Sequence, residues 1–180
     1  MQVFKHKVFL IALSLFFFFI IIGFTQWKAS AQGTNYYSEG PSGGAGGAEW
    51  NEQARLPSIE NHVAEIIVMA GDFIDGISFV NTYPNRSGLW QSYWHGGTGG
   101  NVYPFEIPKG ERLVAITGTY GEFVNQIQFI TSSGKSSIMY GGTKGPVKYY
   151  YRAAPGCEII GFHGRSGQYL DAIGPIIKCK

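Results

Sequence analysis

Two short motifs built around glycine alternate along the chain, and their repetition constrains the fold more than any other feature of the sequence. The first is a glycine-rich loop, with copies at residues 43–47, 96–100 and 141–145. The second has the form Gly-x-aromatic-aliphatic-Asp/Asn-x-Ile, with copies at residues 71–77, 121–127 and 167–173. Successive copies of either motif begin 45 to 53 residues apart. Self-similarity at such an interval predicts a fold made from three equivalent units.

The composition favours strands over helices in all three units. The chain has 26 glycines, and each glycine inside a helix costs about 1 kcal/mol relative to alanine. The segments between the motifs are short, rich in β-branched and aromatic residues, and bounded by Gly, Pro, Asn or Ser, as is typical of strands. We expect strands near residues 63–69, 76–80, 113–117, 126–131, 147–151, 158–162 and 173–178. The sequence therefore predicts an all-β fold of three antiparallel sheets around a pseudo-threefold axis.

Residues 1–31 have the pattern of an export leader. A short basic start precedes an almost wholly apolar run over residues 8–24, and Ala29-Ser30-Ala31 is a small-x-small cleavage signal. We expect a signal peptide cleaved after Ala31, with an uncleaved membrane anchor as the alternative, since the run is just long enough to span a bilayer. Residues 32–39 are expected to form a loose arm before a single domain at 40–180.

The charge, the cysteines and one sequon fit a secreted protein. Removing the leader lysines lowers the net charge from +2 to about −1, and without a basic patch nucleic acid is not an expected partner. Cys157 and Cys179 bracket a segment with a turn at its middle, which predicts a disulfide across the base of a hairpin. Asn85 begins an Asn-Arg-Ser sequon and is a candidate glycosylation site.

The chemistry of the repeated motifs suits a sugar. A carboxylate accepts hydrogen bonds from adjacent hydroxyls, and such charge-assisted bonds are roughly twice as strong as neutral ones. Backbone amides in a tight turn supply the complementary donors, and glycine lets a ligand approach the main chain without a Cβ in the way. Gly-x-x-x-Asp is therefore interpreted as a turn that directs amides and one carboxylate at the same place, with a glycine loop on the other side.

Three stretches carry a family resemblance, namely 40–47, 96–100 and above all 164–174, which has the sequence Gly-Arg-Ser-Gly-Gln-Tyr-Leu-Asp-Ala-Ile-Gly. They resemble the jacalin-related lectins, and the resemblance covers residues 40 to 180. It implies the β-prism fold of three four-stranded sheets. It also implies carbohydrate binding, in which the last Gly-x-x-x-Asp motif faces the first glycine loop.

The same resemblance assigns residues to three sites. Site 1 would consist of Gly47, Gly167, Gln168, Tyr169 and Asp171, with the Tyr169 ring available for a further contact. Site 2 would consist of Gly71, Asp72, Phe73, Asp75 and Gly100. A third site would involve Glu122, Phe123, Asn125 and Gly145. We expect the third site to be weak or vacant, because Asn125 lacks the charge, a difference on the order of 1 kcal/mol, and Lys144 interrupts the glycine loop.

The resemblance favours mannose or glucose as the sugar. Galactose-preferring members of the family are processed to free an α-amino group on a glycine of the first loop, and no processing signal stands out before Gly47. A galactose-preferring lectin remains the alternative within the family.

Other functional classes are less well supported. A glycoside hydrolase would need two acidic groups flanking the scissile bond, and Asp72 and Asp75 are the candidate pair, without an identifiable nucleophile or proton donor. Two carboxylates also fall short of the six to eight oxygens that calcium prefers, so no metal or cofactor is expected. The aromatic side chains expected in core and inter-sheet packing are Trp50, Trp90, Trp94 and the cluster at 149–151. Their alternative place is a homo-oligomer interface, and no membrane insertion of the mature domain is expected.

Overall fold

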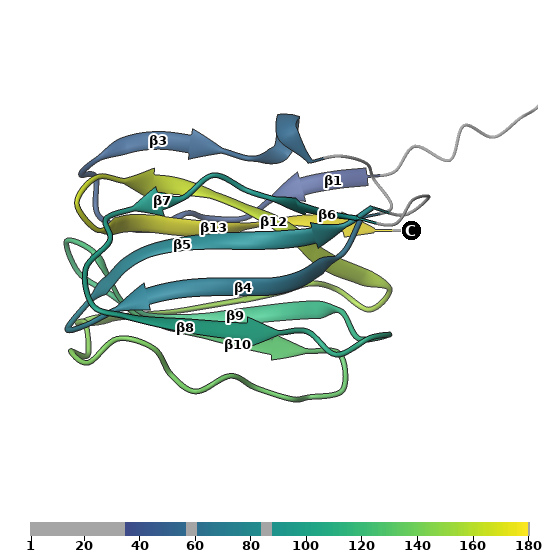
Figure 1. The fold of residues 1–180 in the computed structure, drawn as a ribbon. Helices are drawn as coiled ribbons and strands as arrows, with labels where there is room; N and C mark the ends of the chain where they lie inside the picture. Colours follow the sequence, from purple (N-terminus) through teal and green to yellow (C-terminus); the bar gives the residue numbers. More distant parts are fainter. Residues whose placement is uncertain (1–34, 57–60, 84–87, 180) are drawn as a thin grey trace, which may run out of the picture. The chain divides into compact units, whose positions relative to one another are not determined.

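The structure is a computed structural model, and it describes residues 35–56, 61–83 and 88–179. The leader predicted at 1–31 and the sequon at Asn85 lie outside the described residues. Strands dominate what is described, and they form three antiparallel sheets around a common axis (Figure 1). The predicted all-β architecture is confirmed.

The first sheet contains the first and the last strands of the domain in the sequence. Its strands run in the order β1-β13-β12-β3, with β2 pairing β13. Their bounds are β1 Asn35–Ser38, β2 Ser42–Gly43, β3 Ala48–Asn51, β12 Cys157–Ser166 and β13 Leu170–Cys179. A short 3-10 turn, η1 (Gln53–Arg55), follows β3. Strands β12 and β13 form a hairpin, and the disulfide between Cys157 and Cys179 closes its open end, as the sequence predicts.

The other two sheets are each built on one hairpin. The second has the order β6-β5-β4-β8 with β7 pairing β5, over β4 Val63–Ala70, β5 Ile74–Thr82, β6 Leu89–Gln91, β7 His95–Gly96 and β8 Asn101–Glu106. The third has the order β10-β9-β11, over β9 Leu113–Tyr120, β10 Val124–Thr131 and β11 Val147–Arg152. On the outer side of β10 the ladder consists of two isolated bridges, Ile127 to Tyr140 and Ile130 to Ser136. The third sheet therefore has three regular strands where the family resemblance implies four.

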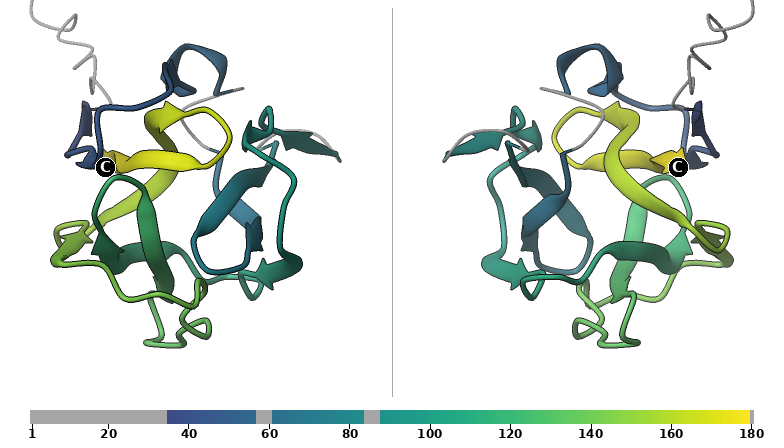
Figure 2. Two further views of the ribbon diagram at one scale, coloured as in Figure 1. Left: turned by 90° about the vertical axis from the view of Figure 1, so that its left-hand side faces the viewer. Right: turned by 90° about the vertical axis from the view of Figure 1, so that its right-hand side faces the viewer.

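The core lies between the three sheets and has the same threefold character. Phe79 from β5, Phe129 from β10 and Phe162 from β12 are fully buried. The Phe162 ring lies 5.4 Å from that of Phe79 and 6.4 Å from that of Phe129, measured between ring centroids. Each such burial contributes about 1.5–3 kcal/mol. The axis of the domain is thus filled by one large aromatic side chain from each sheet. Figure 2 shows the three sheets end-on.

The structure corrects the expected loose arm. Residues 35–38 form β1, which pairs with β13 from Asn35 opposite Cys179 to Ser38 opposite Ile176. The prediction is wrong for these residues because the edge of β13 has unpaired backbone N–H and C=O groups. A strand of almost any sequence can form hydrogen bonds with them.

The predicted packing of the aromatic residues is only partly confirmed. Tyr149 is buried, and Trp50, Trp90 and Tyr151 pack half-buried against the core. Tyr150, however, is 56% exposed, because neighbouring residues of β11 point to opposite faces of the sheet. No helix in the described ranges is long and apolar enough to cross a membrane.

Candidate functional site

The three Gly-x-aromatic segments form three equivalent bends at one end of the domain, where the long hairpins turn (Figure 2). In each bend the glycine amide donates to the carbonyl of the aromatic residue two positions later, over 3.0 Å. The pairs are Gly71 with Phe73, Gly121 with Phe123, and Gly167 with Tyr169. The strands after the bends begin two to three residues earlier than predicted, so that Asp75, Asn125 and Asp171 are the second residues of β5, β10 and β13.

The aromatic rings of the three bends meet at the axis. The ring centroids of Phe123 and Tyr169 are 4.8 Å apart, and Phe73 lies 5.6 Å from Phe123 and 5.7 Å from Tyr169. The rings pack on one another and close this end of the core. The aromatic position is visible in the sequence of each motif, but this contact between residues 46 to 96 positions apart is not.

The structure brings together the first glycine loop and the last motif, the two segments of predicted site 1. Asp171 is 4% exposed, and the Gly44 amide donates to its backbone carbonyl over 2.9 Å. A Cβ atom at Gly46 would overlap Asp171 Oδ1, and one at Gly47, where φ is +58°, would overlap Oδ2. The loop therefore rests directly on the carboxylate, and only glycine permits this approach.

Arg165 holds this loop in place, and the sequence analysis missed it. Its Nε donates to the Gly46 carbonyl and its Nη2 to the Gly47 carbonyl, each over 2.8 Å. Its Nη1 donates to Glu49 Oε1 over 2.7 Å. The available signal was a cation two residues before Gly167, at a position where the other two copies have no charge.

The Asp171 carboxylate binds a proton more readily than an ordinary aspartate. Burial raises the pKa of Asp171, and the Gly167 amide, the Arg165 guanidinium and the amide of Asp171 itself lower it by a smaller amount. Its Oδ2 is buried and accepts no hydrogen bond from any described residue. An unsatisfied buried acceptor calls for a functional explanation.

A hollow of about 410 Å³ adjoins Asp171. One wall is the glycine loop at 44–46 and the other is the bend at 121–123. Glu122, predicted as part of a third site, also lines this hollow beside site 1. The bends and loops interlock around the axis, so that each loop lies between its own motif and the bend of the next sheet.

Predicted site 2 repeats these contacts. Asp75 is 8% exposed, the Gly97 amide donates to its carbonyl over 2.8 Å, and a Cβ at Gly99 would press on its Oδ1. Gly100 has φ +69°. Burial raises the pKa of Asp75, the amides of Gly71 and Asp75 lower it, and the neighbouring Asp72 carboxylate raises it further.

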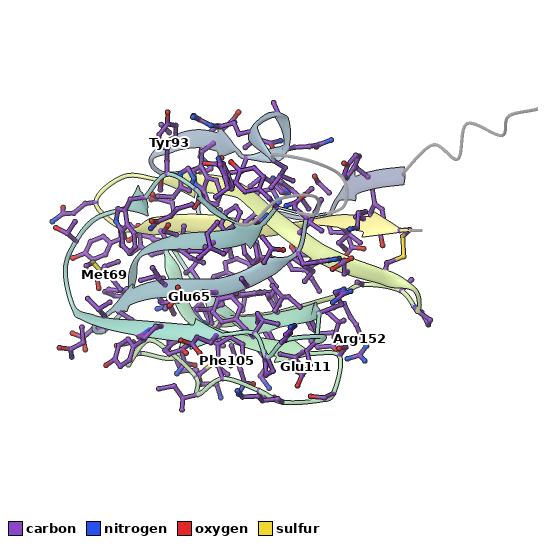
Figure 3. All side chains as sticks on the ribbon, turned by 45° about the vertical axis from the view of Figure 1, so that its right-hand side comes forward. Glu65, Met69, Tyr93, Phe105, Glu111 and Arg152 are labelled. Carbon is purple, nitrogen blue, oxygen red and sulfur yellow. A yellow bond between two sulfur atoms is a disulfide. The ribbon has the colours of Figure 1, made fainter. Side chains whose placement is uncertain are left out.

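The second loop is held by a different side chain. Trp94 Nε1 donates to the Gly97 carbonyl over 2.7 Å, near the start of the second loop. Arg165, in contrast, binds carbonyls at the end of the first loop. The position equivalent to Arg165 is Met69, the penultimate residue of β4, which lies at the end of the domain that carries the bends (Figure 3).

The third copy has the shape of a site, but the amides of its loop are already engaged. The Gly145 amide, equivalent to that of Gly47, is buried and donates to Thr119 Oγ1 over 2.9 Å. The Gly142 and Thr143 amides donate to the carbonyls of Gly71 and Asp72, both over 2.9 Å. This loop thus braces the bend of site 2, an arrangement that the spacing of the motifs did not indicate.

No cluster suited to a metal accompanies these groups. Within the described ranges, no three His, Cys, Asp or Glu side chains are placed together so that they could hold a metal ion.

Known proteins share both the sequence pattern and the fold. The family model described as "Jacalin-like lectin domain" matches residues 39–176. Horcolin of Hordeum vulgare is 33% identical over 143 residues, which cover 75% of this chain and 92% of horcolin. The mannose/glucose-specific lectin of Parkia pendula is 32% identical over 158 residues, and the chain spans only 32% of that relative's length. Jacalin-related lectin 3 of Arabidopsis thaliana is 34% identical, with 23% of its length spanned.

Solved structures agree with the computed one. The Calsepa lectin in complex with a biantennary N-glycan has a TM-score of 0.67 at 28% identity, covering 81% of this chain and 98% of that one. A mannose-binding jacalin-related lectin from Ananas comosus has a TM-score of 0.70 at 23% identity, covering 81% and 99%, and shares the fold.

Proposed function

The chain belongs to the jacalin-like lectin family, and on that premise we propose that it binds mannose/glucose-type glycans without turning them over. The observation that carries the proposal is the arrangement found at two of the three copies. In both, a buried aspartate lies under a glycine loop that no larger residue could form, beside a bend with exposed backbone. Such a site offers acceptors and donors to a ligand rich in hydroxyls.

At site 1, adjacent sugar hydroxyls would donate to the Asp171 carboxylate. The amides of Gln168 and Tyr169 would donate to the ring and hydroxymethyl oxygens, and the Gly47 amide would donate from the loop. At site 2, Asp75 would take the role of Asp171, the bend at Asp72 and Phe73 would supply amides, and Gly100 would replace Gly47. Only a few such bonds hold each sugar, so glycans presented in several copies would bind more tightly through avidity.

The names of the relatives support the choice of sugar. The Parkia pendula protein is a mannose/glucose-specific lectin, and the Calsepa structure holds an N-glycan. We further propose that the protein is secreted after cleavage at Ala31, and that Asn85 carries a glycan. The disulfide of the first sheet agrees with an oxidising compartment.

A calorimetric titration of the purified protein with methyl α-mannoside tests the proposal. We expect two sites, one lost in Asp171→Ala, the other in Asp75→Ala, and both in the double variant. Methyl α-galactoside serves as the control for the galactose-preferring alternative. Binding by the double variant as tight as by the parent protein would show that the sites are elsewhere.

A sugar-release assay separates the lectin from a glycoside hydrolase. Incubation with chromogenic α- and β-mannosides and glucosides should release no chromophore. Release that disappears in Asp72→Asn or Asp75→Asn would instead favour the hydrolase.

A further inference from the structure

The outer face of the first sheet carries a second hollow close to site 1. It has a volume of about 420 Å³, within the range of ligand clefts. Its lining comes from β3 and β12 together with Pro41, and it includes Trp50 and Gly164. The remaining four side chains, those of Glu49, Asn51, His163 and Arg165, are polar, and both signs of charge are present among them.

The register of the strands explains why this face is polar. Glu49 lies opposite Arg165, and Asn51 lies opposite His163. Residues two apart on a strand point to the same face, so the four side chains surround one area. The face is thus built from two cross-strand pairs that immediately precede the bend of site 1.

The second sheet provides an internal comparison, because the same positions there are apolar. Counting back from its bend, Met69 lies opposite Val102 and Ile67 lies opposite Pro104. Of the two proposed sugar sites, therefore, only site 1 has hydrogen-bonding side chains at the four positions next to its bend.

The groups of the hollow suit a neutral hydroxylated ligand. The Glu49 side chain is 82% exposed and accepts hydrogen bonds. Asn51 Oδ1 accepts a hydrogen bond from the backbone N–H of Gln53 over 2.8 Å. The side-chain NH₂ group of Asn51 is then left to donate to a ligand. His163 Nε2 lies 3.0 Å from the Glu39 carbonyl and donates to it, because a carbonyl only accepts.

Arg165 connects the hollow to site 1. Its guanidinium lines the hollow and also donates to the two carbonyls of the loop that covers Asp171. Gly164 and Arg165 precede the bend at Gly167 by three and two residues, which is roughly 7–10 Å along an extended strand. One or two further sugar rings would cover that distance.

From this arrangement we infer that the hollow is a subsite for the second or third residue of a glycan whose terminal sugar is held by Asp171. The inference rests on the proposed function of site 1. It assigns oligosaccharide recognition to site 1 and leaves site 2 to recognise terminal sugars alone.

The test measures the gain in affinity with glycan length at each site separately. The Asp75→Ala variant isolates site 1, and the probes are methyl α-mannoside, the α1-2, α1-3 and α1-6 mannobioses, and a branched mannotriose. At least one oligosaccharide should bind about three- to tenfold more tightly than the monosaccharide, the gain from one net hydrogen bond. In the Asp171→Ala variant, which isolates site 2, affinity should not rise with length.

Two substitutions on the face identify the source of the gain. Asn51→Ala removes the amide, and Asn51→Asp keeps the oxygen that accepts from Gln53 but has no N–H to donate. Both should reduce the gain at site 1 and leave monosaccharide affinity unchanged. Pro104→Ala, at the equivalent position of the second sheet, is the matched control and should change neither quantity.

The outcomes distinguish the two proposals. If the Asp75→Ala variant does not bind the monosaccharide, the proposed function of site 1 fails. If it binds the monosaccharide but no probe binds more tightly, or if the gain persists in both Asn51 variants, the subsite is rejected while the lectin function stands.

Discussion

Proposed sites 1 and 2 have the same arrangement of aspartate and glycine loop, but different side chains hold their loops in place. Both have a buried aspartate, a glycine loop that rests on it, and an amide of that loop bonded to the aspartate carbonyl. Arg165 holds the end of the first loop through two carbonyls, whereas Trp94 holds the start of the second through one. The repeated motif therefore determines which atoms lie around each aspartate, and each sheet holds its loop with a different side chain.

The largest effect is expected where the loops touch the aspartates. Gly47→Ala would place a Cβ against Asp171 Oδ2 and the Ser166 backbone at a φ of +58°. Positive φ alone costs about 1–2 kcal/mol. We expect the number of bound sugars to fall from two to one in calorimetry, together with a lower unfolding temperature.

Gly100→Ala should remove the other site in the same way, because its Cβ would meet the Ala70 backbone. Gly110→Ala is the matched control, since Gly110 has φ +88° but no atom within 4 Å of the added Cβ. It should lower stability and leave both sites intact. Two full sites in Gly47→Ala would contradict the role of the loop.

The next effect separates the two supports. Arg165→Ala removes two hydrogen bonds to the first loop, each worth about 1 kcal/mol. Affinity at site 1, measured in the Asp75→Ala variant, should fall by about tenfold or more. Arg165→Lys should recover little, because an ammonium cannot reproduce the fork that contacts Gly46, Gly47 and Glu49 together.

Met69→Ala is the counterpart at site 2 and should leave its affinity unchanged in the Asp171→Ala variant. An equal loss of sugar affinity in Arg165→Ala and Met69→Ala would mean that any truncation at this position weakens the site, and that the guanidinium has no special role.

These supports also mark the limit of what the sequence reveals. The all-β class and the threefold repeat are predictable, because glycine and aspartate at fixed spacing leave a local and repeated pattern. The pairing of loops with motifs is implied only by the family resemblance. Arg165 and Trp94 act through backbone carbonyls, which any residue supplies, so no partner residue is visible in the sequence. The place of Glu122 beside site 1 and the pairing of β1 with β13 likewise depend on contacts between distant segments.

A smaller effect is expected from restoring charge to the third copy. Asn125→Asp supplies the missing carboxylate, but the Gly145 amide still donates to Thr119 Oγ1 and the loop still braces the bend at Gly71 and Asp72. Calorimetry should therefore still report two sugars per chain. A third bound sugar would show that charge alone separates site 3 from the other two.

The smallest difference lies in how the two sites respond to acid. The pKa of Asp171 and that of Asp75 are both raised by burial, so the folded protein favours the protonated carboxyl. Burial of the carboxylate therefore lowers the free energy of unfolding only as the pH rises above the pKa that the aspartate has in the unfolded chain. At neutral pH, Asp→Asn at either position should not destabilise the protein. Binding has the opposite dependence, because it requires the ionised carboxylate and is lost as the pH falls through the raised pKa.

Site 2 should lose its sugar at a higher pH than site 1. The Asp72 carboxylate raises the pKa of Asp75 further, whereas the Arg165 guanidinium lowers that of Asp171. Titrations of Asp171→Ala and Asp75→Ala with methyl α-mannoside between neutral pH and pH 4 would compare the two midpoints. Asp72→Asn should move the midpoint of site 2 towards that of site 1. Identical midpoints before that substitution would show that burial alone controls both carboxylates, and that the neighbouring charges are too well solvated to distinguish the sites.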